Sequence, residues 1–318
     1  MNKKLIFFTV LVFLGLGGWY VFQQKVGSIN VPEITPITQM QGTGPDGRPI
    51  ALLSGFDLPA GFGISIFAKD VKGARALETD PKGRMLVSQT GEGKIVVLLD
   101  ENYDNVSEAQ KILAEDLKKP HGIAMRCEAE EKCFLYVAEA DTLSRYAYDA
   151  EVPTLGLKEK LMSIKYTITD RHFTRSLIFL PVPQEDILLV SVGSSCDVCL
   201  EKHPEQASII AYNVVTGKKE IYAKGLRNSP FMAMHPVSGK VYATEMGRDG
   251  LGDDLPPDEI NIIETRNNQP KNYGWPICYA KNIHDTSFDK NTYIRNPCLE
   301  PYETASFIDL PAHSAPLG

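Results

Sequence analysis

Short apolar runs recur along this chain at nearly constant intervals. Four of them, MLVSQ, LYVAE, LLVSV and VYATE, begin at Met85, Leu135, Leu188 and Val241, which are 50, 53 and 53 residues apart. Each follows a turn rich in Pro, Gly or charge, and another apolar run precedes each turn: ALET, GIAM, SLIF and FMAM. Strand–turn–strand units that repeat at this interval are typical of propeller blades. The pattern predicts an all-β fold, a six-bladed β-propeller of which about four blades are visible.

Residues 51–318 are predicted to form this propeller domain. Within it, Ile50 to Phe67 is expected to supply a strand that closes the ring, and roughly forty residues after Glu264 read as an inserted loop. A six-bladed ring at about 50 residues a blade needs on the order of 300 residues, which is more than 51–318 provides. We therefore expect an incomplete ring that contains parts of the closing blades, from a fragment or a shortened gene.

The N-terminal segment has a different character. An uncharged apolar stretch runs from Leu5 to Phe22, directly after Lys3 and Lys4. This length just suffices to span a bilayer, and the two lysines orient the N-terminus towards the cytoplasm. Residues 1–24 are predicted to be a membrane anchor or a cleaved signal sequence. Either alternative places the folded domain outside the cytoplasm, in the periplasm or at the cell surface.

Residues 25–50 are predicted to be a linker between this segment and the propeller, because they contain Pro32, Pro36 and Pro45 and little apolar periodicity. The chain as a whole is 43% hydrophobic, which is enough for a sizeable core. Its net charge of −7 and its lack of a basic run exclude a nucleic-acid partner from the expected functions.

The six cysteines fall into three local pairs, Cys127 with Cys133, Cys196 with Cys199, and Cys278 with Cys298. An even number of cysteines in an exported chain predicts disulfides that each close a loop. The CDVC run from Cys196 to Cys199 leaves two alternatives open, a redox dithiol or half of a zinc site. A structural disulfide is favoured because no second CxxC accompanies it.

An acidic loop from Gly247 to Glu259 is the first candidate binding feature. It combines glycines and two prolines with five carboxylates: Asp249, Asp253, Asp254, Asp258 and Glu259. Calcium prefers carboxylate and backbone carbonyl oxygens, and glycine allows a carbonyl to turn inward. The spacing does not fit an EF-hand. A solvated acidic loop without a metal is the alternative.

Polar residues occupy the same two positions in successive repeats, so a hairpin would bring them to one face. Those before the first strand are Arg75, His121, His172, Arg175, Arg227, Asn228 and His313; those after the second are Gln89, Glu139, Asp141, Ser194, Ser195 and residues 245–248. Such a channel mouth offers a neutral histidine as a base and arginines that stabilise a developing oxyanion. No P-loop, serine elbow or GxGxxG motif is present. This inventory predicts an oxidoreductase with a bound organic cofactor.

Several motifs resemble the glucose/sorbosone dehydrogenase family, from about residue 57 to the last residue. They are HFTRSLIF at His172, VSVGSSCDVC at Val190, GLRNSP at Gly225, EMGRDGLGDDLPPDEIN at Glu245, NYGWPICY at Asn272 and AHSAPLG at Ala312. The resemblance implies a six-bladed propeller that binds pyrroloquinoline quinone (PQQ) with calcium and oxidises an aldose or related sugar. It also implies a separate electron acceptor.

The resemblance implies roles for individual residues as well. His172 would be the base that takes the proton from the sugar, and Arg227 with Asn228 would contact the quinone oxygens. The other implied residues are Arg175 and Met246 at the cofactor, His121 and His313 at the substrate, the carbonyls of Gly247 and Arg248 on the PQQ calcium, and Glu259, Tyr273 and Asp285 on a second calcium.

The sequence departs from the family pattern in one position of the site, because Ser194 stands where glucose dehydrogenases have an acidic residue. The basic residues of the closing blades that hold the cofactor's carboxylates are also absent from this sequence. Two other functions therefore stay open. One is a calcium-dependent lactone hydrolase on a propeller, and the other is a non-catalytic propeller that binds a ligand at the membrane.

Overall fold

The computed structural model describes residues 39–43, 49–53, 58–59, 62–129 and 132–316. Over these ranges the regular structure consists of β-strands, and no helix in them is long and apolar enough to cross a membrane. The predicted anchor at residues 1–24 lies outside the described residues. The chain divides into two compact units, 1–69 with 102–106, and 70–101 with 107–318.

In the first unit, the described strands are β1 (Gln39–Thr43) and β2 (Pro49–Leu53), which pair antiparallel. The segment predicted as a linker, residues 25–50, thus contains a strand. Gly42 pairs with Ile50 in this hairpin.

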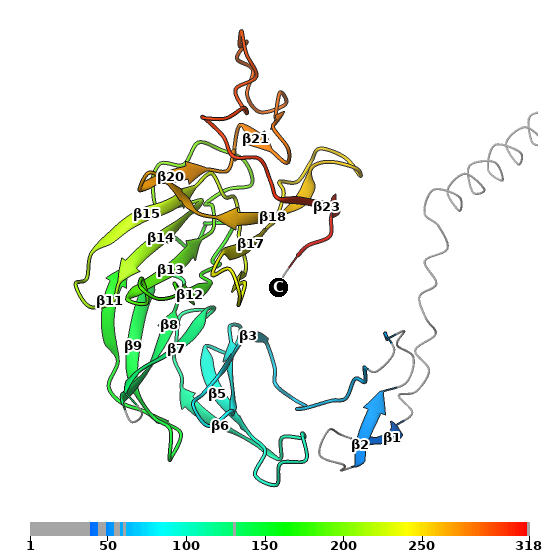
Figure 1. Cartoon of the computed structure of the whole chain (residues 1–318), viewed down its shortest axis with the longest axis vertical. Coiled ribbons are helices and arrows are strands. Elements are labelled where there is room, and N and C mark those ends of the chain that lie inside the picture. Colours follow the sequence, from blue (N-terminus) through cyan, green and yellow to red (C-terminus); the bar gives the residue numbers. More distant parts are fainter. Residues whose placement is uncertain (1–38, 44–48, 54–57, 60–61, 130–131, 317–318) are drawn as a thin grey trace, which may run out of the picture. The chain divides into compact units, whose positions relative to one another are not determined.

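The second unit contains four sheets arranged around a centre (Figure 1). The first sheet comprises β3 (Ala74–Thr79), β4 (Met85–Gln89), β5 (Lys94–Leu99) and β6 (Ala109–Ala114). The second sheet comprises β7 (Ile123–Ala129), β8 (Lys132–Ala138), β9 (Thr142–Asp149) and β11 (Glu159–Ser163), and the short β10 (Thr154–Leu155) also pairs with β9. The third sheet comprises β12 (Leu177–Phe179), β13 (Ile187–Val192), β14 (Ser208–Asn213) and β15 (Lys219–Lys224). The fourth sheet comprises β16 (Met232–Met234), β17 (Val241–Glu245), β18 (Pro257–Ile263) and β23 (Ile308–Ala312).

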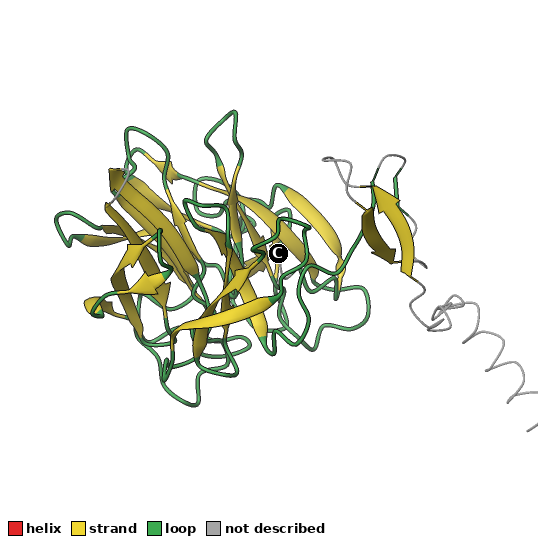
Figure 2. Ribbon diagram, turned by 90° about the horizontal axis from the view of Figure 1, so that it is seen from below, coloured by secondary structure: helices red, strands yellow, loops and turns green. Residues whose placement is uncertain are grey.

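These sheets are the predicted blades. In each, the repeated apolar run is the second strand, and MLVSQ and VYATE coincide with β4 and β17. The first strands β3, β7, β12 and β16 contact one another in sequence order, so they line the centre of the arrangement. Seen from below, the blades consist of strands and loops alone (Figure 2). The predicted all-β propeller is confirmed.

The second strand of the third blade, β13, is buried on both faces because neighbouring blades cover it. Successive side chains of a strand point to opposite faces. In β13, Leu188 and Val190 pack with Tyr136 of the second blade, whereas Leu189 packs with Val241 of the fourth blade. A run of adjacent apolar residues is therefore what a middle strand of a propeller requires.

The predicted insert after Glu264 carries four short strands, β19 (Thr265–Arg266), β20 (Gln269–Asn272), β21 (Cys278–Tyr279) and β22 (Ile283–His284). β20 adds to the third blade, parallel to β15. The three local cysteine pairs form disulfides, Cys127–Cys133, Cys196–Cys199 and Cys278–Cys298. Because Cys196 and Cys199 are bonded to each other, they provide no thiolates for a zinc ion.

Candidate active site

Four loops at one end of the third and fourth blades meet through backbone hydrogen bonds. The amide of His172, before β12, donates to the carbonyl of Ser194, after β13, at 3.2 Å. The Ser194 amide donates to the carbonyl of Arg227, before β16, at 2.7 Å. The Met246 amide, after β17, donates to the Asn228 carbonyl at 3.0 Å. The predicted convergence of first-strand starts and second-strand ends is therefore present here.

His172 presents one free ring nitrogen. Its Nδ1 lies 2.9 Å from the Oγ of Ser194 and 3.2 Å from the carbonyl of the same residue. The Ser194 hydroxyl donates its own proton to the carbonyl of Cys196 at 2.6 Å, so this hydroxyl accepts from His172. Nδ1 thus carries the ring proton, and Nε2 has a lone pair with no partner among the described residues.

The ring of His172 is also held unprotonated. Burial and the positive charge of Arg227 lower the pKa of His172 to about 4, against the opposing hydrogen bond to Ser194. A histidine in this state can accept a proton at neutral pH. Ser194, the residue that departs from the family pattern, orients the ring by accepting from Nδ1, a task that an acidic residue could also perform.

Gly193 allows His172 and Asn228 to approach each other. A Cβ on this residue would lie 2.6 Å from the Cβ of His172 and 3.0 Å from the Oδ1 of Asn228. The first of these distances is shorter than the closest approach that carbon atoms tolerate. The glycine is therefore required by the packing of the site.

Arg227 is buried to all but 3% of its surface, and three of its five N–H groups donate within the chain. Nε donates to the carbonyl of Asp197 at 3.0 Å, and Nη2 donates to the carboxylate of the same residue at 2.6 Å. Nη1 donates to the carbonyl of Met246 at 3.1 Å. Two N–H groups of the guanidinium, one on Nη1 and one on Nη2, remain for another acceptor.

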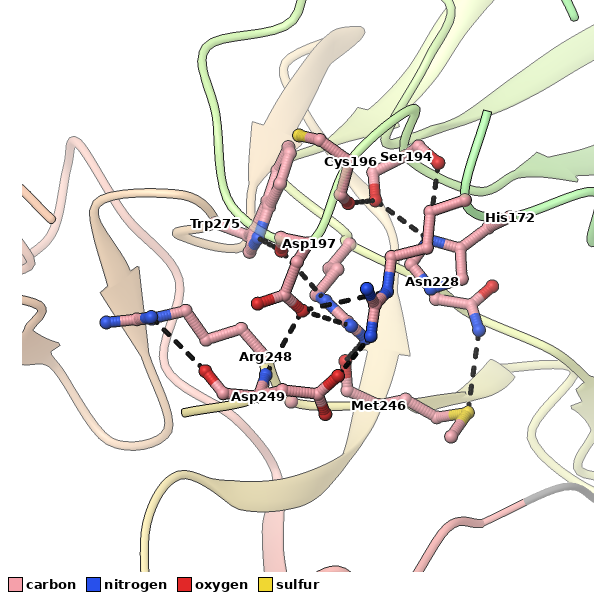
Figure 3. A network of polar contacts seen from close by, with 12 residues as sticks. His172, Ser194, Cys196, Asp197, Asn228, Met246, Arg248, Asp249 and Trp275 are labelled. Atoms are coloured by element: carbon pink, nitrogen blue, oxygen red, sulfur yellow. Dashed lines mark hydrogen bonds and ion pairs between the residues drawn. The ribbon is translucent and has the colours of Figure 1, made fainter. Parts of the chain in front are cut away.

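Asn228 contributes a buried amide with an incomplete set of partners. Its Nδ2 donates to the sulfur of Met246 at 3.5 Å, a weak contact, and its Oδ1 is buried without any partner (Figure 3). Buried polar atoms are nearly always paired, and unpaired ones mark a missing water, ion or ligand. An amide can pair with a ligand in either orientation, since it has both a donor and an acceptor.

The backbone of Gly247 and Arg248 lies on another side of the candidate site, next to Met246. The Gly247 amide donates to Asp258 at 2.8 Å, and a Cβ on Gly247 would lie 2.6 Å from the Cγ of Pro256. Within the described part of the chain, neither carbonyl oxygen of Gly247 or Arg248 accepts a hydrogen bond. These two oxygens are available to a cation.

The acidic loop divides into two parts. Asp253 and Asp254 are exposed, as expected for a solvated acidic loop, whereas Asp258 and Glu259 are buried. Asp258 shapes the loop, because its second oxygen accepts from the Ala315 amide at 2.7 Å.

The three residues predicted for a second calcium line one small cavity of about 20 Å³, together with Gly247 and Arg248. Their oxygens already have partners. Asp285 accepts from the Arg248 guanidinium at 2.5 and 3.1 Å, Glu259 accepts from the Ala280 amide at 2.5 Å, and the Tyr273 hydroxyl donates to a backbone carbonyl at 2.6 Å. Burial raises the pKa of Glu259 to about 6.

The remaining predicted residues lie in different surroundings. His313 is exposed and lines a second cavity of about 190 Å³ with Met246, Gly247 and Arg248. Arg175 is fully buried and donates to the carbonyls of Ala140, Thr174 and Lys165. The structure does not bring it to either cavity.

His121 is buried as well, between Arg75, whose Nε donates to its Nε2 at 3.1 Å, and the ring of Phe231. Burial, then Arg75 and Arg175, lower the pKa of His121 to about 3. A larger cavity of about 650 Å³, lined by Cys133 and residues 147–151 and 154–156, contains none of the predicted site residues.

Asp197 is the residue of the site that the sequence did not reveal. It lies between Cys196 and Cys199 and contacts Arg227, Asp249 and Trp275 (Figure 3). The available signal was an acidic residue inside a CxxC run that precedes the GLRNSP motif.

The TrAA12-like family model matches residues 56–318 of this chain. An uncharacterised protein of Borreliella burgdorferi is 29% identical over 277 residues, covering 84% of this chain and 67% of the relative. The pyrroloquinoline quinone-dependent sugar dehydrogenase of Hypocrea jecorina is 24% identical over 255 residues, covering 69% of this chain and 56% of the relative. The chain thus spans about two thirds of the first relative and just over half of the second.

Among solved structures, the holo form of the PQQ domain of pyranose dehydrogenase from Coprinopsis cinerea aligns with a TM-score of 0.68 at 18% identity. The alignment covers 82% of this chain and 71% of that domain. At this identity the likeness establishes the propeller fold.

Proposed function

Because the chain belongs to the TrAA12-like family, we propose that it is a PQQ- and calcium-dependent sugar dehydrogenase, an oxidoreductase that acts on an aldose or related sugar. The observation that carries the proposal is the grouping of an unprotonated histidine, a buried arginine with two spare N–H groups and two open backbone carbonyls. The name of the Hypocrea jecorina relative supports the same chemistry.

The residues present fit the cofactor. The Oδ1 of Asn228 is a buried atom without a partner, and the guanidinium of Arg227 has donors to spare. These two residues would hold the quinone oxygens, with Met246 beside them, and the carbonyls of Gly247 and Arg248 would bind the calcium. When bound, PQQ accepts a hydride from a sugar carbon.

His172 would act as the general base on the sugar hydroxyl. Its Nε2 lone pair is directed away from Ser194, and its low pKa keeps it unprotonated at neutral pH. Arg227 would stabilise negative charge that develops on the acceptor oxygen, with donors already fixed in position. His313 lines the cavity next to Gly247 and would contact the sugar.

Three roles predicted from the sequence do not match the side-chain contacts in the structure: Arg175 at the cofactor, His121 at the substrate and the second calcium site. For Arg175 we propose a supporting role, since its guanidinium donates to the backbone carbonyls of Ala140, Thr174 and Lys165. His121 would reach a sugar only if Arg75 moved. A second calcium at Glu259, Tyr273 and Asp285 would have to displace the guanidinium of Arg248.

We further propose that the enzyme works outside the cytoplasm, held by the segment at residues 1–24, and passes its electrons to a separate acceptor. Three disulfides support an oxidising compartment.

Addition of PQQ and calcium to the full-length protein is expected to give dye reduction with at least one aldose from a panel, and a chelator should abolish it. Substitution of the exposed Asp253 and Asp254 by asparagine should leave the calcium requirement unchanged, because backbone carbonyls would hold the ion. Hydrolysis of lactones without PQQ would favour the hydrolase instead. No activity in either assay would favour a binding propeller.

Gly193→Ala is expected to lower turnover by about 100-fold, because the new methyl group would displace His172 from its position. Gly91→Ala is the matched control, since a Cβ there meets no atom within 4 Å. Steady-state dye reduction, normalised to the fraction of protein loaded with PQQ, measures both variants. Equal rates in the two would contradict the packing argument.

A further inference from the structure

Asp197 joins three segments of the site. Its backbone carbonyl accepts from the Nε of Arg227 at 3.0 Å and from the indole Nε1 of Trp275 at 3.3 Å. Its carboxylate accepts from the Nη2 of Arg227 at 2.6 Å and from the backbone amide of Asp249 at 3.1 Å (Figure 3). One residue therefore fixes an arginine, an indole and the loop of the proposed calcium ligands.

The position of these bonds on the guanidinium matters. Nε–H and one N–H of Nη2 form one edge of the planar group, and Asp197 occupies that whole edge with its carbonyl and its carboxylate. Nη1 uses one N–H on Met246. One N–H of Nη1 and one of Nη2 remain free on the planar fork, and such donors suit an oxygen acceptor.

Asp197 is itself held in place by covalent and polar bonds. The Cys196–Cys199 disulfide closes the loop around it, and the carbonyl of Cys196 accepts from the Ser194 hydroxyl at 2.6 Å. The amide and hydroxyl of Ser195 both bond to Glu201 at 2.7 Å. Burial opposes ionisation of Asp197, but the Asp249 amide and Arg227 outweigh it and lower the pKa of this carboxyl.

We propose that Asp197 is the positioning residue for Arg227, and that the Cys196–Cys199 disulfide holds Asp197 in the geometry this task needs. The inference rests on the proposed function, in which the free end of Arg227 contacts the cofactor. An ion pair that only stabilised the fold would not need both the backbone and the side chain of one residue on one edge of the guanidinium.

The test is a double-mutant cycle on the PQQ-loaded full-length protein. Asp197→Ala removes the carboxylate and is expected to lower kcat per loaded site by about tenfold, with the sugar KM changed less than about twofold. Asp197→Asn keeps an oxygen acceptor and should retain most of the rate. In an Arg227→Ala background, Asp197→Ala should lower kcat far less than tenfold, because only the contact with the Asp249 amide is then lost.

Asp186→Asn is the matched control. Asp186 lies away from the site, and its carboxylate forms an ion pair with Arg126 at 2.5 Å. Additive effects of Asp197→Ala and Arg227→Ala, or a loss of stability with an unchanged kcat per loaded site, would overturn the inference. Wild-type protein that binds no PQQ would instead overturn the proposed function, and this inference with it.

A second measurement tests the disulfide. Trp19 and Trp275 are the two tryptophans of the chain. In the Trp19→Phe variant, all tryptophan fluorescence therefore comes from Trp275. In that background, Cys196→Ser with Cys199→Ser should shift this emission and reproduce the loss of kcat seen in Asp197→Ala. An unchanged emission and an unchanged kcat would show that the disulfide does not hold Asp197.

Discussion

Replacement of His172 by alanine is expected to lower turnover by roughly 100- to 10,000-fold while PQQ still binds, the range typical for loss of a general base. The expectation rests on the ring's free Nε2 and on the proton that Ser194 fixes on Nδ1. The cofactor would be held mainly by Arg227, Asn228 and the Gly247 backbone, so its affinity should change little. Dye reduction and PQQ titration by fluorescence measure the two quantities separately.

His172→Asn separates the base from its surroundings. The asparagine amide can still donate to Ser194, but it offers no basic nitrogen, so it should be as inactive as alanine. His235→Ala is the control, because that histidine is exposed in the turn between β16 and β17. Recovery of activity in His172→Asn would show that His172 contributes to the packing of the site and does not act as the base.

The pH profile gives an independent reading of the same residue. A histidine whose pKa is about 4 stays unprotonated far below its ordinary value of about 6.5. The acid limb of kcat/KM should therefore have its midpoint well below pH 6.5, with activity constant above it. A midpoint at or above 6.5 would mean that His172 is not the titrating base.

The fold could be predicted from the sequence because blade strands are local and repetitive. The runs at Met85 and Val241 became strands with the expected bounds. Apolar residues that recur at a constant interval between turns are a local signal for such strands. β20 could not be predicted in the same way. Its four residues, QPKN, have no apolar alternation, and its partner β15 lies far away in the sequence.

The candidate site was predictable as a set of positions but not as a set of contacts. Repeat phase placed His172 and Arg227 at the same end of their blades, and the structure brings them to neighbouring loops. The pairing of Arg248 with Asp285 spans 37 residues, and that of Arg227 with Asp197 spans 30. No local pattern encodes such distances, because the register of separate loops sets them.

Burial of charged groups was equally hidden from the sequence. Arg175 and Arg227 occupy comparable repeat positions, and each donates three N–H groups within the chain. Only Arg227 of the two lines the small cavity beside Gly247 and Arg248. Which arginine meets a ligand depends on the depth at which each side chain enters the blade, and only the packed structure gives that depth.

Arg227→Ala is expected to slow turnover at least tenfold, and by about 100- to 1,000-fold if both spare N–H groups stabilise the acceptor oxygen. The variant also removes a positive charge that lowers the pKa of His172, so the acid limb of kcat/KM should move to higher pH. Kinetics of PQQ-loaded protein between pH 4 and 8 measure both effects. An unchanged rate would remove the role proposed for this arginine.

A matched control and a conservative variant make this result specific. Arg266→Ala removes an exposed arginine paired with Glu300 and should change neither rate nor pH profile. Arg227→Lys keeps the charge but has no planar fork, so it cannot bond to Asp197 and Met246 while facing a ligand. The lysine variant should therefore keep the acid limb near the wild-type position yet recover little of the rate, because alignment of the donors, more than charge alone, is what Asp197 secures.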